Sequence, residues 1–433
     1  MFDVFRSTTG DDMILNQPLQ LAHGDVPNRI AKAALSERLA LPDGAPSREL
    51  IRLYEQWAKG GAGLLLTGNV MIDRRALGEL GNVAVEDERH LAELSLWART
   101  MKQGGARAFM QINHPGRQSP FILSKRPVAP SAVPMRGMGG LFRTPRALAE
   151  QEIEEIIQRF ANTAAIAEKA GFDGVQIHGA HGYLISQFLS PLTNLRDDGF
   201  GGDAERRSRF LRLVLAATRA RVSQRFTVGL KLNSADFQRG GFSQEESMAL
   251  VGSLDGIDFL EISGGTYEAA VMFEERNKRD STKRREAFFL EYAERVRAVT
   301  AIPLMVTGGF RTRQGMNDAL SDGATDLIGL GRPLAIEPDL PRRLLQGESE
   351  AAIPVHLDTG ISLIDKTLQG GWYQLQIERL GHGKPADPKL SRFVAVTKYL
   401  LPRRGLTAIE QAGSHSAPRT GSDTSSDQTA SVH

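Results

Sequence analysis

The chain has 433 residues, of which 41% are hydrophobic and 24% charged, and its formal net charge is +2. This length allows one large barrel domain or two to three ordinary domains, and the charge is too small to indicate nucleic-acid binding. The sequence contains no cysteine, which excludes disulfides, thiolate nucleophiles, thiolate zinc sites and cysteine-ligated iron–sulfur clusters. Redox chemistry would therefore need a bound organic cofactor or a metal held by other ligands.

No part of the sequence suggests a membrane or export segment. No stretch approaches the roughly 18 consecutive apolar residues of a membrane span. Residues 1–16 show neither the cationic start nor the apolar core of an export signal. We therefore expect a cytoplasmic protein without membrane or nucleic-acid partners.

In the first half of the chain, short apolar runs alternate with amphipathic helical patterns. Strands are predicted for residues 29–35, 62–67 and 107–112. Ser47 can cap a helix in which Leu50, Leu53, Tyr54 and Trp57 recur at helical spacing. Two further helices are predicted around residues 91–101 and 153–160, and Gly171 stands where the second of these should end.

The second half continues the same alternation. Strands are predicted for residues 174–178, 228–233, 258–263, 303–307 and 326–330. Their apolar runs are continuous, which indicates burial on both faces, as in parallel sheets. Eight strands and eight helices over about residues 29–345 predict a (β/α)₈ TIM barrel of the α/β class; a doubly wound sheet is the less favoured alternative.

Two connections are too long for ordinary βα loops, and both follow strands at the barrel face where active sites form. Residues 115–149 include Arg117, Lys125, Arg126, Arg136, Arg143 and Arg146, with no acidic residue. Residues 266–286 include Lys278, Arg279, Lys283, Arg284 and Arg285. Two interpretations stay open: solvated loop charge, or an electropositive rim that attracts a phosphorylated cosubstrate and so favours NADPH over NADH.

The sequence predicts four parts. A lead-in (1–28) precedes the barrel (29–345), and a C-terminal extension (346–410) precedes a tail (411–433). Tyr373, Ile377 and Leu380 give the extension one apolar helical face, so we expect it to pack on the barrel or on a partner subunit in a homo-oligomer. The tail is mostly Ser, Thr, Gly, Ala and Asp and is predicted to be disordered.

Glycines follow the last two predicted strands. Gly308 and Gly309 end the seventh, and Gly331 with Arg332 ends the eighth. In barrels these two loops commonly bind phosphate, because glycines let backbone N–H groups approach an anion and an arginine adds a bidentate cation. Ordinary tight turns are the alternative.

Three polar rings follow the fourth predicted strand: His178, His181 and Tyr183. A metal site would need a third ligand, and none follows at ligand spacing, so we expect no metal here. A purely structural pair of histidines is a second alternative. The favoured interpretation is that both histidines donate to a substrate oxygen that gains negative charge, while the phenol of Tyr183 donates a proton.

Two residues within the strands are polar where an apolar residue is expected. Lys231 lies within a buried strand and must have a partner or a task. It could stabilise negative charge on a cofactor or form a Schiff base, and its surroundings do not distinguish these. Gln111 ends the third strand with an amide that suits a uracil-like ring edge.

Together these residues resemble the old yellow enzyme family of NADH:flavin oxidoreductases. The resemblance covers about residues 28–345. It depends on Gln111 with His114, Gly116 and Arg117, on the segment 171–184 around His178-Gly179-Ala180-His181-Gly182-Tyr183, and on Gln187, Phe188, Leu189, Ser190, Pro191 and Asn194.

The resemblance implies an FMN-dependent ene-reductase. NAD(P)H would reduce the FMN, which would then reduce the C=C bond of a small-molecule enone. Ala33, Ala34, Leu35, Ser36, Gly68, Gln111 and Lys231 would contact the flavin ring, and Gly308, Gly309, Gly331 and Arg332 its phosphate. His178 and His181 would hold the substrate carbonyl, and Tyr183 would protonate the substrate.

The chain departs from the family at three places. Ser36 stands where Thr or Cys is common, Lys32-Ala33-Ala34-Leu35 where Met-Ala-Pro-Met is common, and Lys231 where Arg is common. These changes bear on the flavin potential and the substrate range. Two rival functions stay open: a Schiff-base aldolase that uses Lys231 on a phosphate-binding barrel, and a barrel that binds FMN without turnover.

Overall fold

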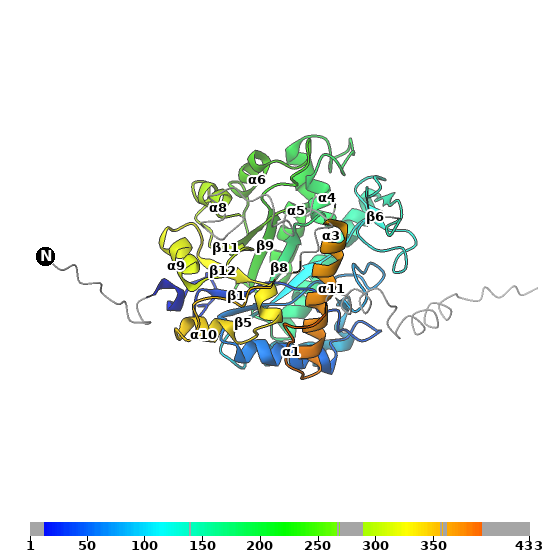
Figure 1. Cartoon of the computed structure of the whole chain (residues 1–433). Helices are drawn as coiled ribbons and strands as arrows, with labels where there is room; N and C mark the ends of the chain where they lie inside the picture. Colours follow the sequence, from blue (N-terminus) through cyan, green and yellow to red (C-terminus); the bar gives the residue numbers. More distant parts are fainter. Residues whose placement is uncertain are drawn as a thin grey trace, which may run out of the picture.

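The computed structural model describes residues 13–137, 140–265, 268, 289–355, 357 and 362–391. Its central strands are β1 (Ile30–Lys32), β2 (Leu64–Leu66), β5 (Arg107–Asn113), β8 (Gly174–Gly179), β9 (Thr227–Asn233), β10 (Phe259–Ser263), β11 (Leu304–Thr307) and β12 (Leu327–Leu330). These strands pair in parallel in the order β2-β1-β12-β11-β10-β9-β8-β5, and β5 pairs back to β2, which closes the barrel (Figure 1). The predicted (β/α)₈ barrel and its eight strands are confirmed.

Helices surround the barrel. They are α1 (Arg48–Lys59), α2 (Leu91–Met101), α3 (Glu150–Lys169), α4 (Leu184–Leu189), α5 (Ala204–Arg221), α6 (Gln244–Val251), α8 (Leu290–Arg297), α9 (Arg313–Ser321) and α10 (Leu340–Leu345), with 3-10 turns η2 (Ile14–Asn16), η3 (Glu88–His90) and η5 (Arg332–Ala335). The predicted cap is present, because Ser47 Oγ accepts a hydrogen bond from the Leu50 N–H at 3.0 Å. Gly171 follows α3 with a φ of 90°, a backbone conformation that favours glycine.

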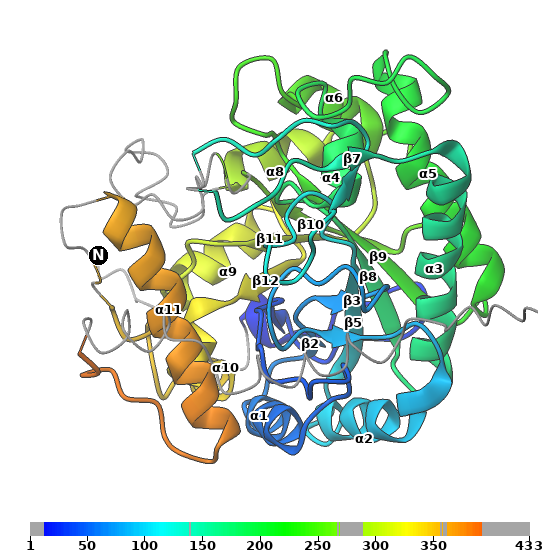
Figure 2. The same cartoon turned by 90° about the vertical axis from the view of Figure 1, so that its right-hand side faces the viewer.

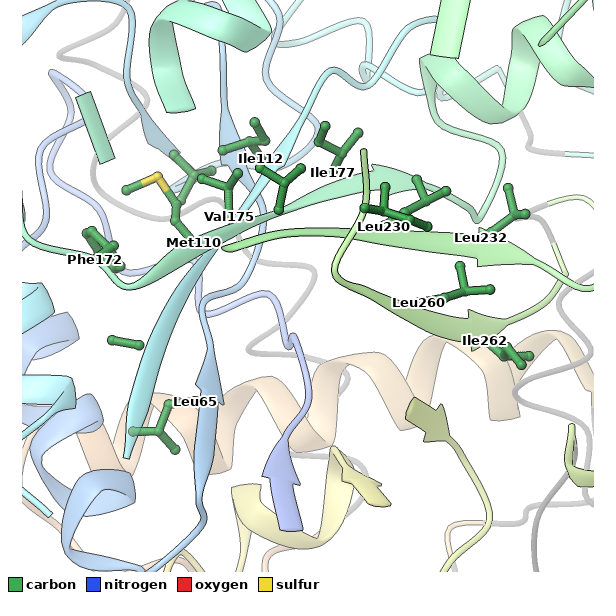
Figure 3. Close-up of a cluster of buried hydrophobic side chains, with 14 of the residues drawn as sticks. Leu65, Met110, Ile112, Phe172, Val175, Ile177, Leu230, Leu232, Leu260 and Ile262 are labelled. Atoms are coloured by element: carbon green, nitrogen blue, oxygen red, sulfur yellow. The ribbon is translucent and has the colours of Figure 1, made fainter. Parts of the chain in front are cut away.

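The strand side chains form two separate layers. Alternate residues point outward and pack under the helices; Figure 3 labels Met110, Ile112, Val175, Ile177, Leu230, Leu232, Leu260 and Ile262 among them. The residues between them point inward, because successive side chains of a strand alternate. The lower interior is apolar, with Phe109, Phe259 and Met305 in one cluster. The next inward positions along β5, β8, β9 and β10 are polar, and they form the base of the site described below.

Four short strands were not predicted. β3 (Val70–Met71) pairs with β5 and with β4 (Val83–Ala84), and β6 (Val128–Ala129) pairs with β7 (Arg146–Ala147) within the first long loop. Two residues are too few to produce a recognisable alternation, so the pattern of the sequence could not reveal them.

Helix α11 (Ser362–Gly381) follows the barrel and packs beside α1, as Figure 2 shows. The contact is partly polar, because Gln56 Nε2 donates to the Leu380 carbonyl at 2.6 Å. Trp372 is buried and its Nε1 donates to the Leu390 carbonyl at 3.0 Å. The predicted boundaries at residues 28, 345 and 410 stay predictions, and the tail 411–433 lies outside the described residues.

Across the described ranges, no helix has both the length and the hydrophobicity to cross a bilayer.

Candidate active site

A pocket opens at the C-terminal ends of the barrel strands, with about 1150 Å³ of empty space that is partly open to solvent. Its walls include the predicted residues Ala33, Ala34, Leu35, Ser36, Gln111, His178, His181, Tyr183, Lys231, Gly308, Gly309, Gly331 and Arg332. They also include Asn69, Ser263, Phe289, Thr307 and Arg311, which the sequence did not single out. All eight strands or the loops that follow them contribute.

Gly68 lies behind the pocket wall rather than in it. Its N–H donates to Glu37 Oε1 at 2.6 Å and lies 3.1 Å from the hydroxyl of Tyr54, so it is not free to bind a cofactor. A Cβ at this position would lie 2.2 Å from both Glu37 Oε2 and the Leu35 carbonyl oxygen, so this packing requires glycine. The flavin contact predicted for Gly68 stays a prediction, and its N–H, which is already bonded, does not support it.

A buried charged cluster lies behind the same wall of the pocket as Gly68. Lys32 points outward from β1, and its Nζ donates to the Leu66 carbonyl at 2.7 Å and to Tyr54 at 3.1 Å while it lies over the Trp57 ring at 4.3 Å. Glu37 accepts hydrogen bonds from Tyr54 and Gly68. Burial lowers the pKa of Lys32 to about 8 and raises the pKa of Glu37. The cluster joins the segments after β1 and β2 to helix α1 and so fixes one wall of the pocket.

The three predicted polar rings come together on another wall. His178 lies at the end of β8, with its ring centroid 5.0 Å from that of His181 and 4.9 Å from that of Tyr183, both edge-on. Tyr183 is buried, and its hydroxyl accepts a hydrogen bond from Asn69 Nδ2 at 3.3 Å. Two imidazoles and one phenol therefore face the same part of the pocket.

The backbone holds His181 in an unusual conformation, with a φ of 61°. Its N–H donates to Asn233 Oδ1 at 3.1 Å, and its Nε2 lies 2.7 Å from Ser263 Oγ. These contacts, from the ends of β9 and β10, fix the ring against the neighbouring strands.

Both imidazoles are neutral near pH 7. Burial lowers the pKa of His178 well below its ordinary value, and the nearby His181 and Lys231 lower it further. Burial, followed by Lys231, lowers the pKa of His181 in the same direction. The Ala180 N–H donates to His178 Nδ1 at 3.2 Å, so the proton of His178 is on Nε2, which can donate. Among the described residues, no three His, Asp or Glu side chains gather as a metal site.

A chain of polar side chains crosses the inside of the barrel below the rings. Gln111 Nε2 donates to Gln176 Oε1 at 2.7 Å, and Gln176 Nε2 donates to Glu261 Oε2 at 2.8 Å. Lys231 Nζ lies 2.9 Å from Glu261 Oε1, and the two form a buried ion pair. Glu261 was not predicted, although a charged residue within the apolar run 258–263 gives the same signal as Lys231 in its own strand.

The opposite end of the pocket suits an anion. Gly308 and Gly309 have φ values of 112° and 101°, which residues with a Cβ rarely adopt. Arg311 and Arg332 line the pocket beside these loops, and the guanidinium of Arg332 lies 5.9 Å from the ring of Tyr373 on α11. Glycine-rich backbone with two cations is the combination that binds phosphate at such strand ends.

The first long basic loop is less cationic than its composition suggests. Arg117 is buried and pairs with Glu268, and Arg146 pairs with Glu152 at 2.5 Å. The basic residues predicted at 278–285 lie outside the described residues. The electropositive rim therefore stays a prediction.

The pocket fits a flavin mononucleotide. Its cationic glycine-rich end matches a phosphate, and Gln111 and Lys231 offer polar groups to the edge of a ring system. Ala33, Ala34 and Leu35 form an apolar wall on which a flat ring can pack. The ring-rich wall of His178, His181 and Tyr183 remains for a second molecule.

The comparisons with known proteins agree with a flavin-binding pocket. The model of the NADH:flavin oxidoreductase / NADH oxidase family matches residues 14–350. The NADH-dependent flavin oxidoreductase iliE of Hypocrea jecorina is 39% identical over 354 residues, which cover 76% of this chain and 88% of the relative. The cinnamate reductase of Clostridium sporogenes is 29% identical over 365 residues, which cover 79% of this chain and 54% of the relative.

Solved structures show the same fold. Morphinone reductase in complex with tetrahydroNAD matches with a TM-score of 0.66 and 27% identity, over 80% of this chain and 93% of the neighbour. A 2-naphthoyl-CoA reductase matches with a TM-score of 0.72 and 26% identity over 77% of this chain, but the chain spans about half of that longer protein, 52%. The chain belongs to the NADH:flavin oxidoreductase / NADH oxidase family, and it is an FMN-dependent oxidoreductase that uses a nicotinamide cosubstrate.

Proposed function

We propose that this protein reduces the activated C=C bond of α,β-unsaturated carbonyl compounds. The observation that carries the proposal is the group of three polar rings, His178, His181 and Tyr183, on one wall of the flavin pocket. Such a group combines two donors for one oxygen with a separate acid, which is what the reduction of a conjugated C=C bond needs.

When bound, FMN supplies the hydride carrier between the nicotinamide and the substrate. The glycines after β11 and β12, with Arg311 and Arg332, would hold its phosphate. Gln111 and Lys231 would bind the polar edge of its ring. The ammonium of Lys231 stabilises negative charge at that edge by Coulombic attraction, more strongly here than in water because the lysine is buried.

His178 and His181 bind the carbonyl oxygen of the substrate. Because both are neutral, neither adds a full positive charge to the pocket. His178 would donate from Nε2, and His181 would donate from Nδ1 while its Nε2 accepts from Ser263 Oγ. The two hydrogen bonds become stronger as negative charge develops on the oxygen, so they polarise the conjugated system. With the β-carbon made more electrophilic in this way, the hydroxyl of Tyr183 would donate a proton to the α-carbon as the reduced flavin supplies hydride to the β-carbon.

Known relatives support this substrate class. The cinnamate reductase of Clostridium sporogenes and the NADH:acrylate oxidoreductase of Vibrio harveyi are named for substrates with a C=C bond conjugated to a carboxyl group. Ketone, aldehyde and carboxylate substrates share the oxygen that the two histidines would bind.

The Schiff-base aldolase is the weaker alternative. A Schiff base needs the amine to attack a carbonyl carbon in the pocket, whereas Lys231 is buried and its Nζ is already paired with the carboxylate of Glu261 at 2.9 Å. An aldolase mechanism would also leave His178, His181 and Tyr183 without a role.

The test is spectroscopic. The purified protein should absorb in the visible range as a flavoprotein, and acid release should yield FMN. NADH or NADPH should bleach this absorbance without oxygen, and 2-cyclohexenone should restore it. Recovery of FAD would refute the cofactor assignment. Bleaching that cyclohexenone, cinnamaldehyde and cinnamate all fail to reverse would refute the proposed substrate class, and no bleaching by either nicotinamide would favour a non-catalytic FMN protein.

A further inference from the structure

Glu261 is a fully buried carboxylate inside the barrel for which the proposed function gives no task. One of its oxygens lies beside the ammonium of Lys231 and the other accepts a hydrogen bond from Gln176. Both neighbours lead to the pocket, because Lys231 lines it directly and Gln176 bonds to Gln111, which also lines it.

The chemistry of these groups fixes the direction of every hydrogen bond in the chain. An ionised carboxylate can only accept, so Gln176 must present its NH₂ group to Glu261. The carbonyl oxygen of Gln176 then faces Gln111, which must present its own NH₂ group in return. The carbonyl oxygen of Gln111 is therefore left as the acceptor available to the pocket.

The orientation of Gln111 matters to a flavin. The polar edge of the flavin ring carries carbonyl oxygens on either side of an N–H group, and an acceptor in the pocket can bind that N–H. A reversed amide would present a donor to the same N–H and lose the bond. The backbone of Gln111 is held separately, since its N–H donates to Thr67 Oγ1 at 2.8 Å, so the amide can turn while the strand stays in place.

We propose that Glu261 is a positioning residue for the flavin, which through Gln176 sets the end of the Gln111 amide that faces the cofactor and which also fixes the ammonium of Lys231. The proposal rests on the binding of FMN in the proposed function. Glu261 acts through its neighbours and lines no part of the pocket itself.

The experiment measures the dissociation constant of the apoprotein for FMN by quenching of flavin fluorescence. Glu261→Gln keeps the shape of the side chain but adds a donor, so the direction of the chain is no longer fixed. Loss of one hydrogen bond to a buried ring edge weakens binding by roughly ten- to hundredfold, and that is the expected result.

A second variant should restore binding. In the double variant Gln176→Glu/Glu261→Gln, the carboxylate moves one position along the chain and the charge of the barrel interior is unchanged. Glu at 176 again forces Gln111 to present its NH₂ group, so affinity should return to within about threefold of the wild type. A role for Glu261 that depends only on packing or on stability gives no such recovery.

Asp258→Asn is the matched control, because it removes a carboxylate just before the start of β10, the strand that carries Glu261. Asp258 pairs with Arg219 and accepts a hydrogen bond from the Val228 N–H at 2.7 Å, away from the pocket. This variant should lower the stability of the protein and leave the affinity for FMN unchanged.

The outcomes are distinct. Wild-type apoprotein that does not bind FMN overturns the proposed function. Wild-type protein that binds FMN while Glu261→Gln binds it equally well overturns only the role of Glu261, and so does a double variant that fails to recover.

Discussion

Replacement of Tyr183 by Phe should slow one half of the catalytic cycle and leave the other unchanged. The ring stays, so its edge-on contact with His178 at 4.9 Å is kept. Removal of the hydroxyl also removes a long hydrogen bond from Asn69, 3.3 Å, which is worth about 1 kcal/mol or less, so the variant should fold. Loss of a positioned acid typically costs about 10²–10⁴-fold in rate, or roughly 3–5 kcal/mol of barrier.

The two half-reactions can be measured separately by stopped-flow absorbance of the flavin. Reduction by NADH needs no proton from the protein, so the variant should match the wild type. Reoxidation by 2-cyclohexenone needs a proton at the α-carbon, so the variant should be slower by about 10²–10⁴-fold. Tyr292→Phe, which removes a buried hydroxyl that donates to Ser247 at 2.7 Å away from the pocket, should alter neither rate. If Tyr183→Phe slows both halves equally, or neither, the acid is another group.

Further predictions concern stability and cosubstrate choice. Burial lowers the pKa of His114 to about 4, below the 6.5 of an exposed imidazole, so the unfolded chain takes up the proton first. The free energy of unfolding measured in urea should therefore fall by about 3 kcal/mol on account of His114 as the pH drops from 6.5 to 4. His114→Asn should make the free energy of unfolding less dependent on pH over this range. Trp372→Ala should destabilise the protein by about 3–5 kcal/mol, since the ring of this α11 residue is buried in a cluster with Ile336 and Leu357; unchanged unfolding would mean that the extension is not docked. Gly229→Ala would place a Cβ 1.9 Å from the Phe259 ring and should cost about 1–3 kcal/mol, part of which Phe259→Leu should restore. The two basic loops predict faster flavin reduction by NADPH than by NADH, with a difference that shrinks as salt is added; equal rates at low ionic strength would contradict this.

The barrel could be predicted because each of its strands leaves a strong local pattern. Short apolar runs recur between helices whose apolar residues follow a period of 3.6, and turn residues separate them. Strands such as β3 and β6 contain two residues and depend on neighbours far along the chain for their pairing. No local pattern encodes that pairing.

The residues of the site also differ in how well the sequence reveals them. His178, His181 and Tyr183 are close in sequence, so one segment reveals them together. Asn69, between β2 and β3, and Ser263, in β10, reach the same wall from distant parts of the chain, and single polar residues carry no signal of their own.

Lys32 shows the limit of reading a residue by its position in a motif. The sequence suggested a change beside the flavin, whereas its side chain points away from the barrel interior and bonds behind the wall to Leu66 and Tyr54. The direction of that side chain follows from the alternation along β1, where Ile30 also points outward.

The φ of 61° at His181 restricts how this protein can acquire new substrates. Asn and Asp adopt the left-handed region more readily than other residues with a side chain, and Gly adopts it freely, whereas Val, Ile and Thr are strained there. His178 is in an extended strand and carries no such restriction. Libraries that vary the two oxygen-binding positions should therefore be unequal: a wide choice at 178, and at 181 mainly Asn, which combines a tolerated backbone with a hydrogen-bond donor.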